Sequence, residues 1–166
     1  MNLNSVQGII ELSDAQFESI LRAEVSIRSL ITQETSVPLL KRCSKRFGSH
    51  EISSRYLEFI LSRMLEIDPN DLSVLIALAW ELWYFGEDEE GRKNLAKAQQ
   101  INPNHKWVLY LEIALSSNIQ DKIAILESLN TQYPDDTQVS HNLDALKSGK
   151  ADMVLAFDPD ECMNNW

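Results

Sequence analysis

The histidines and cysteines are the residues whose types could bind a metal ion or attack a substrate, and their spacing argues against both. His50, His105 and His141 lie far apart in the sequence, and Cys43 and Cys162 are separated by most of the chain. Metal-binding and redox motifs place two such residues within a few positions of each other. We therefore expect no metal site and no redox-active cysteine pair.

Other reaction chemistry has no better support. His50-Glu51 begins like the zinc-protease motif, but the position that should carry the second histidine is Ser54. The carboxylate run 88–90 starts a predicted helix, where it complements the positive end of the helix dipole. The sequence contains no phosphate-binding glycine loop and no nucleophile elbow. It thus predicts a protein that is not an enzyme, with no catalytic residue and no cofactor.

The net charge restricts the class of partner. The chain has 15 Lys and Arg against 25 Asp and Glu, which gives a formal charge of −10 at pH 7. Such a protein should repel nucleic acid and anionic membranes and favour basic partners. The charge also keeps a protein soluble, so much of it can be plain solvated surface. We expect a protein partner and no nucleic acid.

The segments that could direct the chain to or across a membrane are missing from the sequence pattern. The first basic residue is Arg22, so no charged segment precedes an apolar stretch as in a secretory signal peptide. The most apolar run, 72–85, is too short to span a bilayer and predicts a buried helix instead. We expect a cytoplasmic protein with no membrane insertion.

Three prolines mark a repeat. Pro69 and Pro103 lie 34 residues apart in the similar segments Asp-Pro-Asn-Asp and Asn-Pro-Asn-His, and Pro134 follows 31 residues later. Because the residue before a proline is pushed out of the helical region, each position predicts the end of a helix. A fixed period in this range indicates stacked pairs of helices.

Apolar residues recur at helical spacing, and no strand-like alternation competes with them. Ser13 and Gln16 form a capping-box pattern that predicts a helix start, while Gly8 predicts a break near the N-terminus. The predicted fold class is therefore all-α. The predicted helices cover about 14–33, 37–47, 51–67, 72–85, 88–101, 105–116, 121–132 and 137–147.

Segment 72–105 contains a set of residues at characteristic positions of a helix pair. They are Leu75, Leu78 and Ala79 in the first helix, Gly86 between the helices, Ala98 late in the second helix and Pro103 at its end. With these residues the segment resembles the tetratricopeptide repeat family, although it departs from the family at Gly91, where alanine is preferred. This departure should weaken the second helix by up to about 1 kcal/mol. The resemblance implies a short right-handed α-solenoid of antiparallel helix pairs.

The resemblance extends more loosely over the rest of the chain and predicts one domain, 1–166. Terminal repeats are expected to be atypical because one face has no neighbour. The predicted parts are an N-terminal cap helix at 13–37, repeats at 38–71, 72–105 and 106–136, a capping helix at 137–149, and a tail at 150–166.

In the tetratricopeptide family the first helix of each pair lines a concave groove, which implies a set of partner-binding residues. Aromatic residues at helical spacing are also common in cores, so burial is the alternative. The basic cluster Lys41, Arg42, Lys45 and Arg46 either pairs internally with acidic residues or binds an acidic segment of a partner. The implied binding residues are Arg42, Arg46, Ile76, Trp80, Trp83, Tyr84, Trp107 and Tyr110.

Three functions fit these patterns. The first is an interaction module, either an adaptor or a dedicated chaperone, that holds a segment of another protein in the groove. The second is an immunity-type protein or inhibitor that neutralises a basic partner through its acidic surface. The third is a structural subunit whose groove is filled by the tail 150–166, which leaves homo-oligomerisation open.

Overall fold

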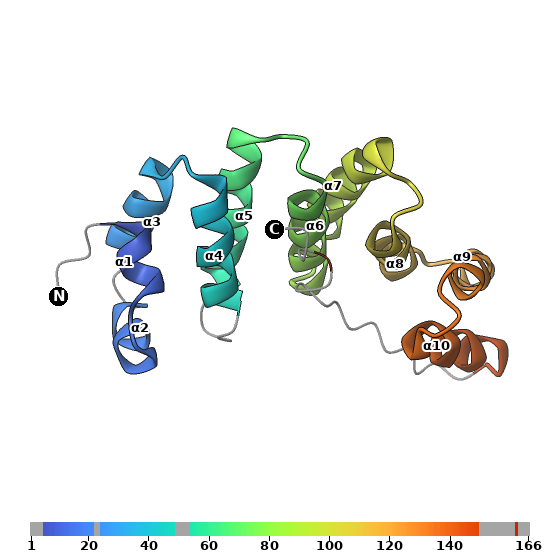
Figure 1. Cartoon of the computed structure of the whole chain (residues 1–166). Coiled ribbons are helices and arrows are strands. Elements are labelled where there is room, and N and C mark those ends of the chain that lie inside the picture. The colour runs from blue at the N-terminus through green and yellow to red at the C-terminus, as the bar shows by residue number, and fades with distance from the viewer. Residues whose placement is uncertain (1–4, 22–23, 49–53, 150–161, 163–166) are drawn as a thin grey trace. The chain divides into compact units, whose positions relative to one another are not determined.

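The computed structural model of the chain describes residues 5–21, 24–48, 54–149 and 162 (Figure 1). These ranges contain ten α-helices and no strand, so the all-α prediction is confirmed. Within them, none of the helices combines the length and the apolar character needed to cross a membrane. The chain divides into two compact units, with the boundary between Val74 and Leu75.

The first unit contains five helices around an aromatic core. The rings of Phe17 and Phe47 are 4.9 Å apart, and those of Phe47 and Tyr56 are 5.2 Å apart. The Tyr56 hydroxyl donates a hydrogen bond of 2.8 Å to the Leu21 carbonyl. Helix α4 packs against α1 and α5, and α3 packs against α5. The helices are α1 (Val6–Ile10), α2 (Asp14–Ile20), α3 (Glu24–Gln33), α4 (Val37–Gly48) and α5 (Ser54–Ile67).

Two predictions for this unit are wrong. The predicted helix 14–33 is two helices, α2 and α3, with residues 22–23 between them outside the described residues. Gly8 lies inside α1 rather than at a break, and its N–H donates to Ser5 Oγ at 3.1 Å. Apolar spacing marks the buried face of a helix but does not show where the backbone leaves it. The predicted start at Ser13 is correct, with the Ser13 N–H donating to Gln16 Oε1 at 3.1 Å.

The second unit is a succession of helices in which neighbours along the chain pack together. Helix α8 packs against α7 and α9, and α9 packs against α10. Figure 1 shows α8, α9 and α10 following one another at the orange end of the chain. Helix α6 crosses the boundary between the two units, because its first three residues belong to the first. The helices are α6 (Leu72–Tyr84), α7 (Asp88–Ile101), α8 (Lys106–Leu115), α9 (Ile119–Gln132) and α10 (Thr137–Lys147).

The helix ends predicted from the prolines are confirmed. Helices α5, α7 and α9 end two residues before Pro69, Pro103 and Pro134, respectively. The N-terminus of each following helix is capped by the side chain of the last residue in the turn that precedes it. Asp71 Oδ1 accepts from the Val74 N–H at 3.2 Å, and His105 Nδ1 accepts from the Trp107 N–H at 3.3 Å. Local sequence therefore fixes these helix boundaries.

Candidate functional site

The aromatic residues of α6 change from buried to exposed along the helix. Trp80 is only 7% exposed and Trp83 is half-buried. Tyr84 and Phe85, at the end of the helix, are 73% and 54% exposed. They are the two aromatic residues with the most exposed surface in the described part of the chain.

The buried aromatic rings connect α6 to α8. The Trp80 ring lies 5.1 Å from Trp83 and 6.3 Å from Trp107, both edge-on, and the Trp107 ring is 5.3 Å from Tyr110. The structure thus brings together four of the predicted binding residues, namely Trp80, Trp83, Trp107 and Tyr110. Ile76, Trp80, Trp107 and Tyr110 are buried, as the alternative of a core role expects, so their part in binding stays a prediction. Trp83 and Tyr84 keep accessible surface.

A fixed turn holds Tyr84 and Phe85 at the end of α6. The Gly86 N–H donates to the Trp83 carbonyl at 3.0 Å, and the Glu87 N–H donates to the Leu82 carbonyl at 2.8 Å. Gly86 has a φ of +80°, which favours glycine, and this pair of bonds is the Schellman ending of a helix. The rings of Tyr84 and Phe85 meet edge-to-face at 5.2 Å. Phe85 is not among the predicted binding residues, although its position directly before a helix-ending glycine indicates an exposed turn.

Gly91 seats α7 against α6. It is buried, and a Cβ added there would lie 3.2 Å from the Ala79 carbonyl oxygen and 3.8 Å from Leu82 Cβ. The absence of a side chain therefore permits a close approach of the two helices. Gly91 has a low helix propensity, as predicted, and it also permits the close packing of α7 on α6. Helix propensity describes only the first of these effects.

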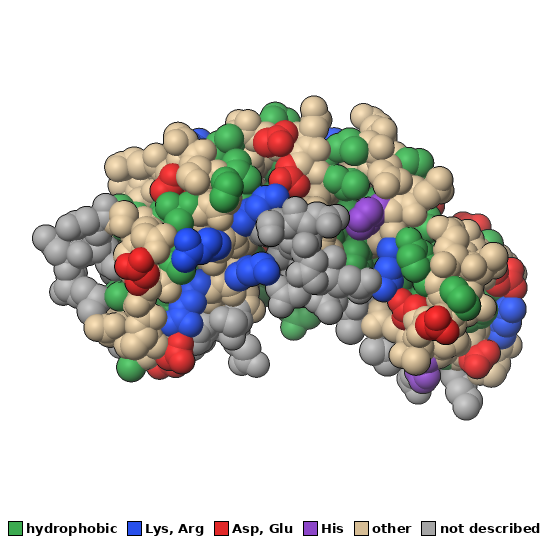
Figure 2. Space-filling model, in the orientation of Figure 1, with side chains coloured by type: hydrophobic (Ala, Val, Ile, Leu, Met, Phe, Trp, Pro, Cys, Tyr) green, Lys and Arg blue, Asp and Glu red, His purple; other side chains and the backbone are tan. Residues whose placement is uncertain are grey.

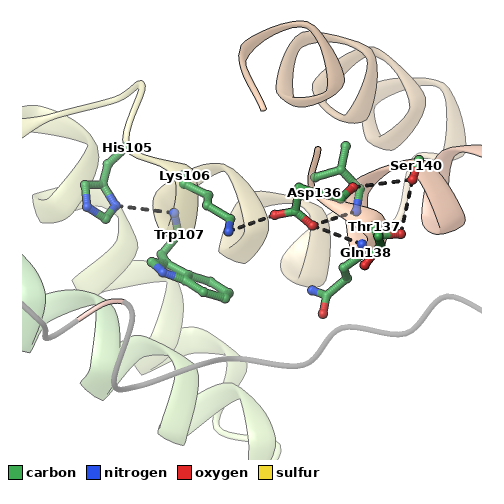
Figure 3. A network of polar contacts seen from close by, with 8 residues as sticks. His105, Lys106, Trp107, Asp136, Thr137, Gln138 and Ser140 are labelled. Carbon is green, nitrogen blue, oxygen red and sulfur yellow. Dashed lines mark hydrogen bonds and ion pairs between the residues drawn. The ribbon is translucent and has the colours of Figure 1, made fainter. Parts of the chain in front are cut away.

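A polar network lies next to Trp107, one of the buried aromatic residues that connect α6 to α8 (Figure 3). Lys106 Nζ lies 2.7 Å from Asp136 Oδ2 and 5.0 Å from the centre of the Trp107 ring. Asp136 also accepts from the backbone N–H groups of Gln138 and Val139, at 3.0 and 3.2 Å. Partial burial opposes ionisation of Asp136, but Lys106 and these N–H donors outweigh it and lower the pKa of the carboxyl. The ion pair thus ties the start of α8 to the start of α10.

The basic cluster of the first unit is largely engaged within that unit. Figure 2 shows Lys and Arg side chains gathered over α4. Lys41 pairs with Asp71 at 2.9 Å, and Arg46 pairs with Asp14 at 2.8 Å. These pairs confirm the expectation of internal pairing for two members of the cluster.

The two predicted binding arginines have different surroundings. Arg46 Nη2 donates to the Leu12 carbonyl at 3.1 Å, and its guanidinium lies 4.7 Å from the centre of the Phe17 ring. Arg42 is exposed and reaches Gln7 Oε1 at 3.4 Å. Arg46 therefore has a structural role in joining α4 to α2 and to the turn before it. A partner-binding role for either arginine stays a prediction.

Groups that could carry a reaction are few among the described residues. No three metal-ligating side chains come together there. Burial, with a smaller effect from the charge of Glu34, raises the pKa of Cys43 to about 12, so its thiol stays neutral. A cleft of about 390 Å³ between α7, α8 and α9 contains Arg92, but this side chain is hydrogen-bonded to the Leu115 carbonyl. These groups do not form a nucleophile–base pair.

Comparisons with known proteins add no family to these observations. A scan against protein-family models found no match, and searches of curated proteins and of solved structures found none either. The strongest candidate site in the described part of the chain is the exposed end of α6, with Tyr84 and Phe85, because it combines exposed aromatic residues with a hydrogen-bonded turn.

Proposed function

We propose that the protein is a non-enzymatic protein–protein interaction module that binds a segment of another protein at the C-terminal end of α6. The observation that carries this proposal is the exposure of Tyr84 and Phe85 on a hydrogen-bonded turn. The binding surface is defined as Trp83, Tyr84 and Phe85, and we call it the aromatic corner.

The chemistry of the aromatic corner suits binding. Tyrosine and tryptophan dominate the energetics of protein interfaces, since they bury a large area with few rotatable bonds. The turn at Gly86 fixes the backbone, so little conformational freedom is lost when a partner binds. Trp80 and Trp107 give the corner a packed base. A pair of large exposed aromatic residues on a rigid turn is thus a favourable anchor point.

The proposed form of the module is a short tetratricopeptide-like α-solenoid that acts as an adaptor or a dedicated chaperone. The supporting features are the proline-terminated helices and the helix pairs α6–α7 and α8–α9, which correspond to the predicted repeats 72–105 and 106–136. In that form α6 and α8 are the first helices of their pairs and line the binding face. Cys43 and Cys162 are both buried and far apart in the sequence, which suits a reducing cytoplasmic setting.

Capture of partners from a lysate of the source cells tests this proposal. We would compare the wild type with the double variant Tyr84→Ser/Phe85→Ser by affinity purification and quantitative mass spectrometry. A matched control, Ile101→Ser/Ile119→Ser, removes apolar side chains that are 43% and 56% exposed elsewhere in the same unit.

The wild type and the control should retain a set of proteins that the corner variant loses. Circular dichroism should show the same helicity for all three proteins, because the substituted side chains are exposed. Capture of the same proteins by the corner variant would place the binding surface elsewhere.

The second candidate is an inhibitor that neutralises a basic partner by charge. It is favoured by the net charge of −10 and by the internal pairing of Lys41, Arg46 and Lys106, which occupies three of the basic side chains. Association would then slow steeply as salt is added, and the corner variant would bind as the wild type does. Those two results together would replace the first proposal with this one.

A further inference from the structure

Two acidic residues follow the aromatic corner closely in the sequence. Tyr84 and Phe85 are followed by Gly86 and then by Glu87 and Asp88, all of them exposed. The hydrogen bonds from the Gly86 and Glu87 N–H groups fix this turn. Exposed apolar and anionic residues therefore follow one another closely along one short, hydrogen-bonded stretch of backbone.

These carboxylates differ from their neighbours in α7. Glu89 and Glu90 share Lys93, whose Nζ lies 3.4 and 2.5 Å from their oxygens. Among the described residues, Glu87 and Asp88 have no ion-pair partner. Two carboxylates beside two exposed rings thus give the corner a negative charge that the described side chains do not neutralise.

We infer that the aromatic corner binds a protein segment in which a lysine or arginine stands next to an apolar side chain. The apolar side chain packs on Tyr84 and Phe85, and the cation meets Glu87 and Asp88. A cation is attracted to the face of a tyrosine ring as well as to carboxylates, so Tyr84 and the neighbouring Glu87 and Asp88 all favour it. This inference rests on the proposed function and names the chemistry of its partner.

Charge also decides between this partner and the chain's own C-terminal segment. Residues 150–166 contain one basic residue, Lys150, and four acidic ones, Asp152, Asp158, Asp160 and Glu161. Such a segment has the same sign of charge as Glu87 and Asp88 and so lacks the charge complementarity of a cationic partner. A separate cationic partner is therefore the better occupant.

Three synthetic peptides of equal length test the inference by fluorescence anisotropy with the full chain. The first alternates arginine and leucine, the second glutamine and leucine, and the third arginine and glycine. The arginine–leucine peptide should bind most tightly. The variant Glu87→Lys/Asp88→Lys should weaken this binding by at least about tenfold, and Tyr84→Ser/Phe85→Ser should do the same.

A matched control makes the same change in net charge elsewhere. Asp135→Lys/Asp144→Lys replaces two exposed carboxylates, one in the turn before α10 and one within it. It should leave binding within about twofold of the wild type, since distant exposed charges are screened by salt. Equal weakening by the control and by the corner charge reversal would show general attraction to an acidic protein and overturn the inference.

The remaining outcomes separate this inference from the proposed function. Equal affinity for the arginine–leucine and glutamine–leucine peptides, with both lost in the serine variant, would keep the surface and overturn the cationic preference. Unchanged binding to the serine variant would overturn both. No binding of any peptide would overturn the inference alone, because the capture experiment tests the proposed function independently.

Two results would identify a different occupant of the corner. A dimer that dissociates on Glu87→Lys/Asp88→Lys would show that a second copy of the chain covers it. Tighter peptide binding by Phe157→Ser would show that the C-terminal segment covers it. Either result would overturn the inference of a separate cationic partner.

Discussion

Lys106 and Asp136 form an ion pair in which Nζ lies 2.7 Å from Oδ2, and both side chains are largely buried. Lys106 is the first residue of α8, and Asp136 caps the N-terminus of α10, so the pair joins two helices that are not consecutive. The same lysine lies over the rings of Trp107 and Tyr133. The position of Trp107, and through it that of Trp80, thus depends in part on this pair.

Substitution of Asp136 should separate its two roles. Asp136→Ala removes both the ion pair and the helix cap, and should lower the free energy of unfolding by about 1–2 kcal/mol. Asp136→Asn keeps an oxygen for the cap and should cost less, about 0.5–1 kcal/mol. Urea denaturation followed by circular dichroism measures both values. Equal losses in the two variants would mean that the cap contributes nothing.

The effect of pH on this ion pair has a defined sign. Because folding lowers the pKa of Asp136, the carboxylate stabilises the fold above its unfolded-state pKa. This contribution is lost as the pH falls through the folded-state pKa. The stability difference between the wild type and Asp136→Asn should therefore shrink below about pH 4. A difference that stays constant down to lower pH would contradict the assignment.

Two glycine substitutions should have different effects on stability. Gly8→Ala in α1 places its Cβ 3.5 Å from Ser5 Oγ, an ordinary contact, so it should gain about 0.5–1 kcal/mol of stability from helix propensity. Gly91→Ala should not show this gain, because its Cβ would lie 3.2 Å from a backbone oxygen that cannot easily move. Thermal unfolding of the two variants compares them directly. Equal stabilisation would show that α7 can shift away from α6 without loss.

The helix ends of this chain could be predicted from sequence because their causes are local. A proline two residues after a helix and a capping side chain at the end of the turn act within a few positions, as at Pro103 and His105. The start of α9 was predicted two residues late. The Asn118 side chain caps that helix by accepting from the Gln120 N–H at 2.9 Å, and the prediction did not use it.

The candidate site was less predictable, since burial depends on contacts between distant segments. Trp80 and Tyr84 occupy similar positions in the apolar pattern of α6, yet one packs on Trp107 while the other is exposed. Apolar spacing cannot distinguish them without the position of α8. The predicted set of binding residues therefore mixed core residues with surface residues and omitted Phe85.

Arg46 should matter for stability and Arg42 should not. Arg46→Lys keeps the charge but loses the planar group that reaches Asp14, the Leu12 carbonyl and the Phe17 ring. We expect it to lower the free energy of unfolding by about 1 kcal/mol. The control Arg42→Lys should change it by less than about 0.5 kcal/mol, because Arg42 is exposed.

Urea denaturation of both arginine variants and peptide binding by Arg46→Lys complete this test. If Arg46 acts only within the fold, its lysine variant binds the arginine–leucine peptide as the wild type does. A loss of binding without a loss of stability would instead restore its predicted role at a binding surface.

The two cysteines should resist modification in the folded protein. Cys43 is fully buried, and its pKa of about 12 leaves it protonated at about pH 8, where thiol reagents need the thiolate. Cys162 is only 4% exposed, so burial should limit the access of the reagent to its sulfur. The single-cysteine variants Cys43→Ala and Cys162→Ala allow each rate to be measured with an aromatic disulfide reagent. Both rates should rise by at least about a hundredfold in denaturant, since reaction then no longer requires opening of the fold. Rapid reaction of Cys162 in the native protein would show that it is accessible in solution, and would remove it from the core of the second unit.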